Sequence, residues 1–266
     1  MDDEKLGTSA IVFSNLGALS SRTSMTININ TFTKLQHNDD HIHIAFSSPQ
    51  RILSSAILNG GLVKVDHIVN RKVPKHSSSC EAPERSLSNY AKAQGWHGHV
   101  VGMMTAASMN SLRIEQACVK SVDITVLVTT GVSNARRAGD KADIQTLLST
   151  PSEAGTINLI LIFSVQLTDA AMVEAMMIAT EAKAAALQNA GILSPVSGLL
   201  ATGTGTDAIA VVSGEGSQEI KFCGKHVLLG EWIGRLVIAA VTSSLAFTQK
   251  SARCSGLYKP LHANLI

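Results

Sequence analysis

The sequence predicts a protein of the α/β or α+β class, in which a mixed β-sheet packs within a single domain against long helices rich in alanine and glycine. Short runs dense in β-branched and aliphatic residues recur along the chain, as buried strands do. Two long stretches carry helical start or stop signals. Neither an internal repeat nor a linker divides the 266 residues, so one large domain is expected.

Two strands are predicted in the first third of the chain, on either side of a tight turn. Residues 41–46 alternate polar and apolar side chains, which is typical of a half-buried strand. The turn signal Asn59-Gly60-Gly61 leads into a second alternating run at 62–69. Two prolines and three consecutive serines then indicate an exposed loop over residues 70–85.

Three later segments are predicted to be buried strands. Residues 123–130 and 157–165 are short and dense in β-branched and aliphatic side chains, and residues 208–213 follow a segment of alternating glycine and threonine. Runs of this length and composition fit strands that are covered on both faces.

Two long helices are predicted. The first spans about residues 169–189, because the Thr168 hydroxyl can accept an orphan backbone N–H and Asp169 suits the positive end of the helix dipole. Gly191 fits a left-handed helix terminator. The second helix is predicted from about residue 225 to about residue 245.

The predicted domain spans residues 41–247. Residues 1–40 are polar and weakly periodic, so they are predicted as a poorly defined N-terminal segment, and residues 248–266 are predicted as a C-terminal tail.

Composition argues against several classes of function. A formal charge of +2 is too close to neutral for a nucleic-acid footprint. The apolar run at 236–247 is broken by polar residues and is shorter than the roughly 20 residues of a membrane span, so we interpret it as a core helix. The acidic N-terminus does not resemble a signal peptide, and four widely spaced cysteines fit a reducing cytosol. We therefore expect a cytoplasmic protein.

Two histidine pairs have the spacing of metal ligands on a strand. They are His41 with His43 and His97 with His99. No third ligand follows at a suitable spacing, so no metal site is predicted.

Four segments carry small and polar residues in patterns that packing does not require. They are residues 58–61, 129–140, 201–207 and 224–235. The second segment directly follows a predicted buried strand, which is where open α/β folds place ligands. Its Ser, Asn and Arg side chains could hold carbonyl-rich or anionic groups, or they could form a turn and a solvated basic helix start.

The third segment alternates glycine with threonine and ends in Asp207. Gly203 and Gly205 can direct backbone N–H groups toward an oxyanion, and Asp207 could orient a catalytic group or act as a base. The alternative is a tight turn before a strand, capped by Asp207. The segment has neither the Lys-Ser/Thr pair of a P-loop nor dinucleotide-binding spacing.

In the fourth segment His226, Gly230 and Gly234 recur at i, i+4 and i+8 and so share one helix face. Each interior glycine costs about 1 kcal/mol relative to alanine, which close packing or ligand approach must offset. His226 near a helix N-terminus suits a neutral base, whereas Glu231 can pair with Arg235 on a neighbouring face. A helix packed through its glycines, with His226 on the surface, is the alternative.

These segments resemble the adenosylcobinamide amidohydrolase family of corrinoid salvage. The resemblance spans about residues 45–240 and is carried by residues 51–61, 101–106, 130–140, 155–158, 180–183, 201–207 and 226–235. It implies hydrolysis of the amide that joins a corrin propionate arm to aminopropanol, which releases adenosylcobyric acid. An archaeal source would fit this route.

Amide hydrolysis needs an acid or base and groups that hold the carbonyl. We predict the catalytic residues Asp207, His226 and Glu231. The predicted substrate-binding residues are Asn59, Gly131, Ser133, Asn134, Arg136, Arg137, Thr202, Gly203, Thr204, Gly205 and Thr206. Attack by water is preferred to attack by Ser133 or a threonine, because an unassisted hydroxyl is a weak nucleophile.

No cofactor is expected beyond the cobalt that the corrinoid substrate carries, and a homo-oligomer is possible. Two other classes of function remain open. One is a corrinoid-binding protein without catalysis, and the other is an amide or acyl transferase with a Ser or Thr nucleophile.

Overall fold

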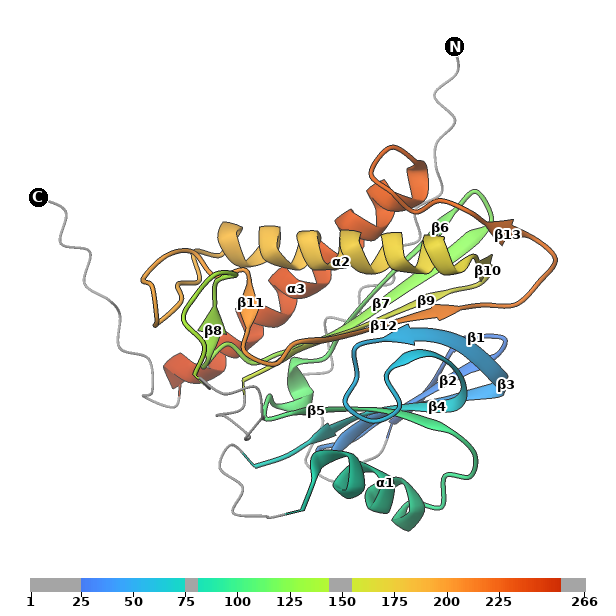
Figure 1. Ribbon diagram of the computed structural model, residues 1–266, viewed down its shortest axis with the longest axis horizontal. Coiled ribbons are helices and arrows are strands. Elements are labelled where there is room, and N and C mark those ends of the chain that lie inside the picture. The colour runs from blue at the N-terminus through green and yellow to red at the C-terminus, as the bar shows by residue number, and fades with distance from the viewer. Residues whose placement is uncertain (1–24, 75–80, 144–154, 255–266) are drawn as a thin grey trace, which may run out of the picture.

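A curled, mixed sheet dominates the fold, with two long helices on one side of the molecule and a shorter helix on the opposite side (Figure 1). The computed structural model describes residues 25–74, 81–143 and 155–254. Within them nine strands form this sheet. Seven lie side by side in the order β1 (Met25–Asn30), β2 (Thr33–His37), β3 (His41–Ser54), β12 (Ala208–Ser213), β9 (Ile157–Phe163), β7 (Val122–Thr130) and β6 (Arg113–Val119). β4 (Gly61–Lys72) pairs with β3 and with β5 (Val100–Thr105).

The central strands are the ones that the sequence predicts as buried. Every residue of β9 and β12 is buried, because each strand has apolar layers on both sides. β12 runs parallel to β9 and antiparallel to β3, whereas β7 runs antiparallel to β9. The predicted mixed sheet in a single α/β unit is therefore confirmed.

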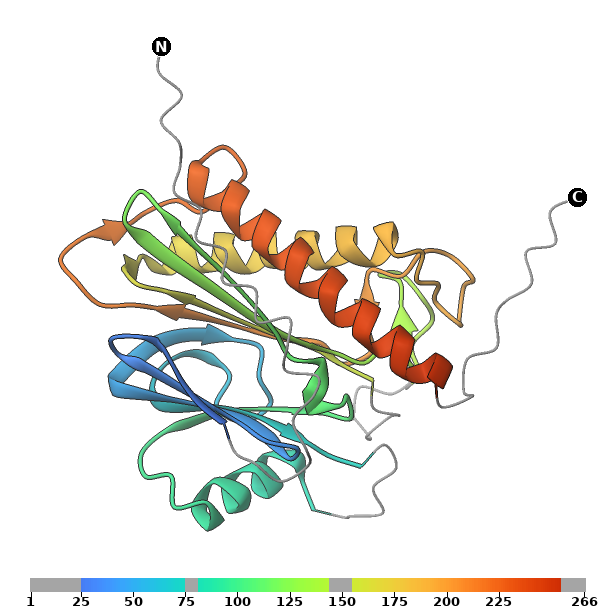
Figure 2. The same cartoon turned by 180° about the vertical axis from the view of Figure 1, so that it is seen from behind.

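Helices α2 (Asp169–Asn189) and α3 (Leu228–Cys254) pack against the same face of the sheet (Figure 2). The Thr168 hydroxyl accepts a hydrogen bond of 3.1 Å from the backbone N–H of Ala171, as predicted. Gly191 has a φ of 65°, which ends α2 in the left-handed conformation expected for a terminating glycine. Small alanine side chains on the buried face of α2 let the helix lie close to the sheet.

Helix α3 begins at Leu228 and extends beyond the predicted end at residue 245. Its segment Leu228–Lys250 is long and apolar enough to cross a membrane by length and composition, but half of the most apolar window is buried inside the protein. The helix is buried against the sheet and α2, as expected for the core helix that the sequence predicts.

The apolar interior forms three clusters. The largest lies between the sheet and helices α2 and α3, and the second lies inside the curl of the sheet. The smallest lies beneath α1 (Pro83–Ala93), which covers the opposite side of the molecule in Figure 1.

Some elements differ from those that the sequence predicts. Strands β1 and β2 lie within the segment 1–40, which the sequence predicts as poorly defined. Met25–Asn30 does alternate polar and apolar residues, but the run is only six residues long. β3 continues to Ser54 because a bulge between Ala45 and Gln50 lets one strand bend through the curl. β4 and α1 occupy both ends of the predicted loop 70–85, and residues 75–80 lie outside the described residues.

Four short strands complete the fold. β8 (Ala135–Arg136) pairs with β11 (Gly203–Thr204), and β10 (Gln166–Leu167) pairs with β13 (Glu219–Ile220). The β8–β11 pair lies near the C-terminal end of α2 (Figure 1).

A layer of aromatic and histidine rings joins β3, β4 and the α1 region. The His43 ring stacks on Trp96 with centroids 3.9 Å apart, and its Nε2 lies 3.2 Å from Nδ1 of His67. His41 Nδ1 lies 2.8 Å from the hydroxyl oxygen of Tyr90. Burial above all, together with the neighbouring His67 and His41, lowers the pKa of His43 to about 3.

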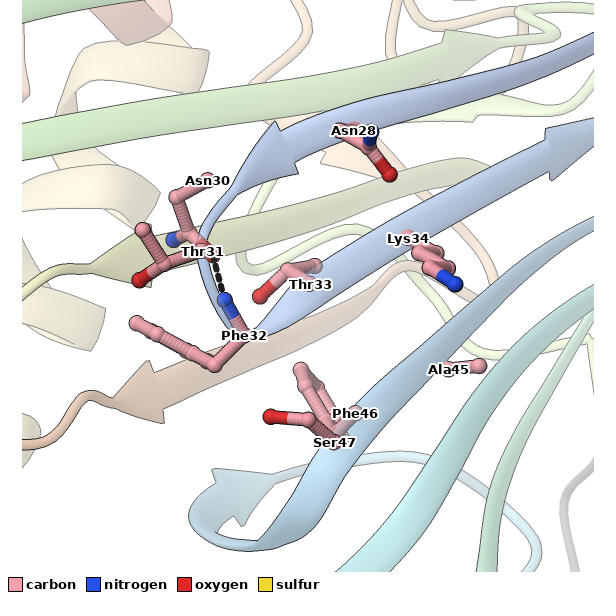
Figure 3. Close-up of a pocket in the computed structure, with 9 residues that line it drawn as sticks. All are labelled: Asn28, Asn30, Thr31, Phe32, Thr33, Lys34, Ala45, Phe46 and Ser47. Carbon is pink, nitrogen blue, oxygen red and sulfur yellow. Dashed lines mark hydrogen bonds between the residues drawn. The ribbon is translucent and has the colours of Figure 1, made fainter.

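A pocket of about 650 Å³ lies over the β1–β2 hairpin and β3 (Figure 3). Its lining residues are Asn28, Asn30, Thr31, Phe32, Thr33, Lys34, Ala45, Phe46 and Ser47. None of the site residues predicted from the sequence lines this pocket.

The two glycines of α3 should differ in what they tolerate. A Cβ at Gly230 would lie 2.0 Å from the carbonyl oxygen of Gly224, whereas one at Gly234 would meet only Ile178, at 3.9 Å. We expect Gly230→Ala to lower the free energy of unfolding by about 2–3 kcal/mol. Gly234→Ala should raise it by about 0.5–1 kcal/mol. Urea unfolding of both variants checks this, and equal effects would contradict the packing described.

The buried His43 should make the fold sensitive to acid. Its folded-state pKa of about 3 lies below the value near 6.5 of an unfolded chain, so between these values the unfolded state binds a proton that the folded state does not. We expect the free energy of unfolding to fall as the pH drops from about 6.5 toward 3. In His43→Phe, which keeps a ring on Trp96, this fall should be shallower. Urea unfolding at several pH values gives both slopes, and parallel slopes would refute the assignment.

Candidate active site

Two of the predicted site segments meet at one end of the sheet. In the β8–β11 ladder Gly203 is paired with Arg136 and Thr204 with Ala135. The Thr202 side chain extends this contact, because its hydroxyl accepts a hydrogen bond of 2.9 Å from the backbone N–H of Ala138. The segments 129–140 and 201–207, far apart in the sequence, therefore form one surface.

The carboxylate of Asp207 fixes the turn that precedes β12. One oxygen accepts hydrogen bonds from the Ile157 backbone N–H at 2.9 Å and the Thr204 hydroxyl at 2.5 Å, and the other accepts the Thr204 backbone N–H at 3.0 Å. Asp207 also forms an ion pair with Lys183 of α2. The two side chains are only 11% and 7% exposed, so this is a buried pair. Asp207 thus ties α2, β9 and the Gly/Thr turn together.

Glycines make room for these polar side chains. A Cβ at Gly203 would lie 2.5 Å from the Asp207 carboxylate and 3.0 Å from the Lys183 ammonium. The Asn134 side chain lies between two other glycines: a Cβ at Gly155 would be 2.2 Å from its Oδ1, and one at Gly205 would be 3.3 Å from its Nδ2. The alternation of glycine with polar residues therefore reflects close packing around buried polar groups.

Three threonine hydroxyls gather around the backbone carbonyl of Gly155. The Thr204 and Thr206 hydroxyl oxygens lie 3.0 and 3.1 Å from this carbonyl oxygen, and Thr156 lies 2.9 Å from the Thr206 hydroxyl. Gly205 and Thr206 are exposed, whereas Asp207 beneath them is largely covered. The turn therefore presents a small polar surface to solvent on a rigid, charged base.

Both predicted arginines have partners. The guanidinium of Arg136 forms a bidentate pair with Asp143, at 2.8 and 2.9 Å. Arg137 donates to the carbonyl of Leu200 at 2.9 Å, and its backbone N–H donates to Asp140 at 2.7 Å. These contacts make the arginines structural links of the site rim, although both side chains stay partly accessible.

The other residues of the first two segments lie around the same end of the sheet. Asn59 is exposed with a φ of 53°, and its amide donates to the Val100 carbonyl at 2.8 Å. Its turn is joined to the start of β12, because Ser55 and Ile209 exchange hydrogen bonds of 3.0 and 3.1 Å. A Cβ at Gly131 would lie 3.1 Å from that of Ala107, and Ser133 is exposed.

The fourth segment lies elsewhere. His226 is exposed, just before α3, and its ring makes an edge contact with Phe222. Glu231 pairs with Arg235 at 2.7 Å on the exposed side of the helix. Figure 1 shows the first turn of α3 at the far end of the molecule from β8 and β11. The structure does not bring His226 and Glu231 together with Asp207, and their catalytic roles stay predictions.

Sequence reasoning missed Lys183. The side chain is buried on α2 and ion-paired with Asp207. The sequence did contain a sign of this role, because Lys183 is the single lysine of the long alanine-rich helix α2. It also falls on the buried face of that helix. Lysine is rarely buried without a partner, which is the reasoning that could have linked it to an acid.

A buried polar network was missed as well. Asn70 donates to the Thr129 hydroxyl at 2.9 Å and accepts from the Asn158 amide at 2.8 Å, so the network joins β4, β7 and β9 beside the site. The Asn158 Oδ1 is buried and has no hydrogen-bond partner among the described residues. An asparagine inside the otherwise apolar run of β9 was the available signal.

The chemistry available at this end of the sheet is that of hydroxyls, amides and one buried ion pair. Such groups can hold a carbonyl and its flanking amides by hydrogen bonds. Within the described ranges, no group of three or more His, Cys, Asp and Glu side chains is placed to hold a metal ion.

Comparison with known proteins agrees with this chemistry. The adenosylcobinamide amidohydrolase family matches residues 24–253. An adenosylcobinamide amidohydrolase of Methanosarcina mazei is 31% identical over 197 residues, which cover 71% of this chain and 86% of the relative. An uncharacterized protein of Methanocaldococcus jannaschii is 36% identical over 157 residues, which cover 54% of this chain and 61% of that protein.

These matches define an enzyme, a hydrolase that acts on an amide in corrinoid salvage. The chain belongs to the adenosylcobinamide amidohydrolase family. The resemblance stated from its sequence motifs is thereby confirmed.

Solved structures are less similar. The PH0078 protein of Pyrococcus horikoshii OT3 and a beta-aminopeptidase of Burkholderia sp. each give a TM-score of 0.41 at 9% identity. The first comparison covers 84% of this chain and 82% of the other, and the second covers 85% and 88%. At this level of similarity neither bears on the chemistry.

The buried ion pair should be coupled energetically. Asp207→Asn leaves the Lys183 ammonium buried without its counter-charge, so we expect a loss of about 3 kcal/mol in the free energy of unfolding. Adding Lys183→Met should restore part of that loss, because no uncompensated charge then remains. Glu231→Gln, in the exposed pair with Arg235, serves as the control and should cost below about 1 kcal/mol. Additive losses in a double-mutant cycle would show that the pair is not coupled.

Proposed function

We propose that this protein hydrolyses the aminopropanol amide of adenosylcobinamide and releases adenosylcobyric acid and 1-aminopropan-2-ol. The observation that carries this proposal is the family match over residues 24–253, nearly the whole described chain. The arrangement of hydroxyls and amides around Gly155 and Gly205 supports it, because an amide substrate needs such groups to hold its carbonyl.

In the proposed reaction a water molecule adds to the amide carbonyl carbon, the C–N bond then breaks, and the leaving amine takes up a proton. The exposed Gly205–Thr206 turn is where the substrate carbonyl would lie, because it is accessible and rigidly held. Asn134 would support this turn from below through its contact with Gly205. Asp207 would hold the turn in place together with Lys183.

A threonine nucleophile is the second possibility, and one contact favours Thr204. Its hydroxyl oxygen lies 2.5 Å from a carboxylate oxygen of Asp207, an arrangement that can activate a hydroxyl. Such an enzyme would carry the corrinoid acyl group on Thr204 before water or another amine removes it. We keep direct attack by water as the first choice, because the same hydroxyl also lies close to the Gly155 carbonyl and so belongs to the turn.

The remaining parts of the proposal concern what the enzyme works with. We propose that it needs no cofactor or metal of its own, since cobalt arrives with the substrate, and that it acts in the cytoplasm. A homo-oligomer is compatible with this proposal. A corrinoid-binding protein without catalysis is the competing function.

The reaction can be tested with the full chain. We expect purified protein, incubated with adenosylcobinamide, to produce adenosylcobyric acid and free aminopropanol, with and without a chelator, as followed by chromatography and mass spectrometry. Tight binding without product would favour the competing function.

The two mechanisms make different predictions for Thr204→Val. If water attacks directly, the variant should keep measurable turnover, with a decrease on the order of tenfold from loss of a hydrogen bond to the turn. If Thr204 is the nucleophile, turnover should disappear, and wild-type protein quenched during the reaction should carry a corrinoid adduct by intact-mass measurement. Thr206→Val controls for loss of a neighbouring hydroxyl.

A further inference from the structure

The loop between α2 and the Gly/Thr turn exposes an unusual amount of apolar surface. Within residues 193–200 four large side chains are exposed: Leu193 by 44%, Val196 by 44%, Leu199 by 57% and Leu200 by 39%. A single exposed leucine needs no explanation, but several in one short loop mark a binding surface. We call residues 193–200 the apolar loop.

The apolar loop is held in a defined shape. The Ser194 backbone N–H donates to the Leu199 carbonyl at 2.8 Å, and the Gly198 N–H donates to the Ser194 carbonyl at 2.9 Å. Leu193 and Leu200 pair as an antiparallel bridge. A surface that keeps its leucines exposed while its backbone is fixed is prepared for a partner, because the ordering cost is met before binding.

The apolar loop is held by residues of the site segment 129–140. The Ser194 hydroxyl donates to Asp140, and the Arg137 guanidinium donates to the Leu200 carbonyl at 2.9 Å. The loop then continues directly into Thr202, which is hydrogen-bonded to Arg136 through its backbone N–H. The loop and the proposed carbonyl site are therefore parts of one rigid unit.

Resting on the proposed function, we propose that the apolar loop is the surface on which the macrocycle of the substrate packs during hydrolysis. The scissile amide lies on a short side arm of a large ring, so the ring must lie against protein surface next to the site that cuts the arm. The Gly/Thr turn is polar and suits the amide. The neighbouring leucines suit the apolar parts of the ring, and the loop leads directly into the turn while Arg137 holds the Leu200 carbonyl.

This assignment gives the apolar loop a role in specificity. Leu199→Ser in the full chain should raise KM for adenosylcobinamide on the order of tenfold and leave kcat nearly unchanged, because contact with the ring is the same before and during the chemical step. The matched control is Met177→Ser on the exposed face of α2. Met177 is also 57% exposed but lies outside the loop, so its KM should stay at the wild-type value.

A binding measurement separates this inference from the chemistry. Adenosylcobyric acid keeps the ring but lacks aminopropanol, so calorimetry should show about tenfold weaker binding of it to Leu199→Ser than to wild type or Met177→Ser. A wild-type protein that does not hydrolyse adenosylcobinamide would overturn the proposed function itself. An active wild type with unchanged KM and unchanged product binding in Leu199→Ser would overturn the role of the loop. Dissociation of a wild-type dimer by Leu199→Ser, with KM unchanged, would assign the loop to contact between copies of the chain instead.

Discussion

The buried ion pair between Lys183 and Asp207 is the interaction on which the candidate site depends. Removing two charges from water is costly, and the cost is offset only because Asp207 also accepts hydrogen bonds from Ile157 and Thr204. Through these contacts one carboxylate links the C-terminal part of α2, the start of β9 and the turn that precedes β12. Gly203 is required at this point because any side chain would occupy the space of the ion pair.

In this arrangement the residues that hold the turn in place differ from the residues that would contact the substrate. The charged pair and Asn134 are buried, whereas Gly205 and Thr206 above them are exposed. A rigid turn of this kind can present hydrogen-bonding groups without reorganising when a substrate arrives, which is the usual basis of electrostatic stabilisation in enzymes. The apolar loop follows the same plan, since Asp140 and Arg137 fix its backbone while its leucines stay exposed.

Much of the fold could be predicted from the sequence because its central elements carry local signals. The buried strands, the cap at Thr168 and the stop at Gly191 follow from residue patterns that act over a few positions. The strands β1 and β2 carry weaker local signals, since each is only five or six residues long and polar side chains make up at least half of it. The network of Asn70, Thr129 and Asn158 was also out of reach, because its members come from three strands.

The sequence by itself determined the family, the buried strands and the importance of the segments 129–140 and 201–207. Only the tertiary structure decided which of these segments meet. It placed Lys183 against Asp207, and it placed the first turn of α3, which carries Glu231 and follows His226, at the other end of the molecule (Figure 1). The physical reason is that the residue type alone fixes which interactions a side chain can make, whereas the order of the strands and the direction of the helices decide which side chains it meets. A buried charge in particular takes its partner from whichever segment the sheet brings beside it.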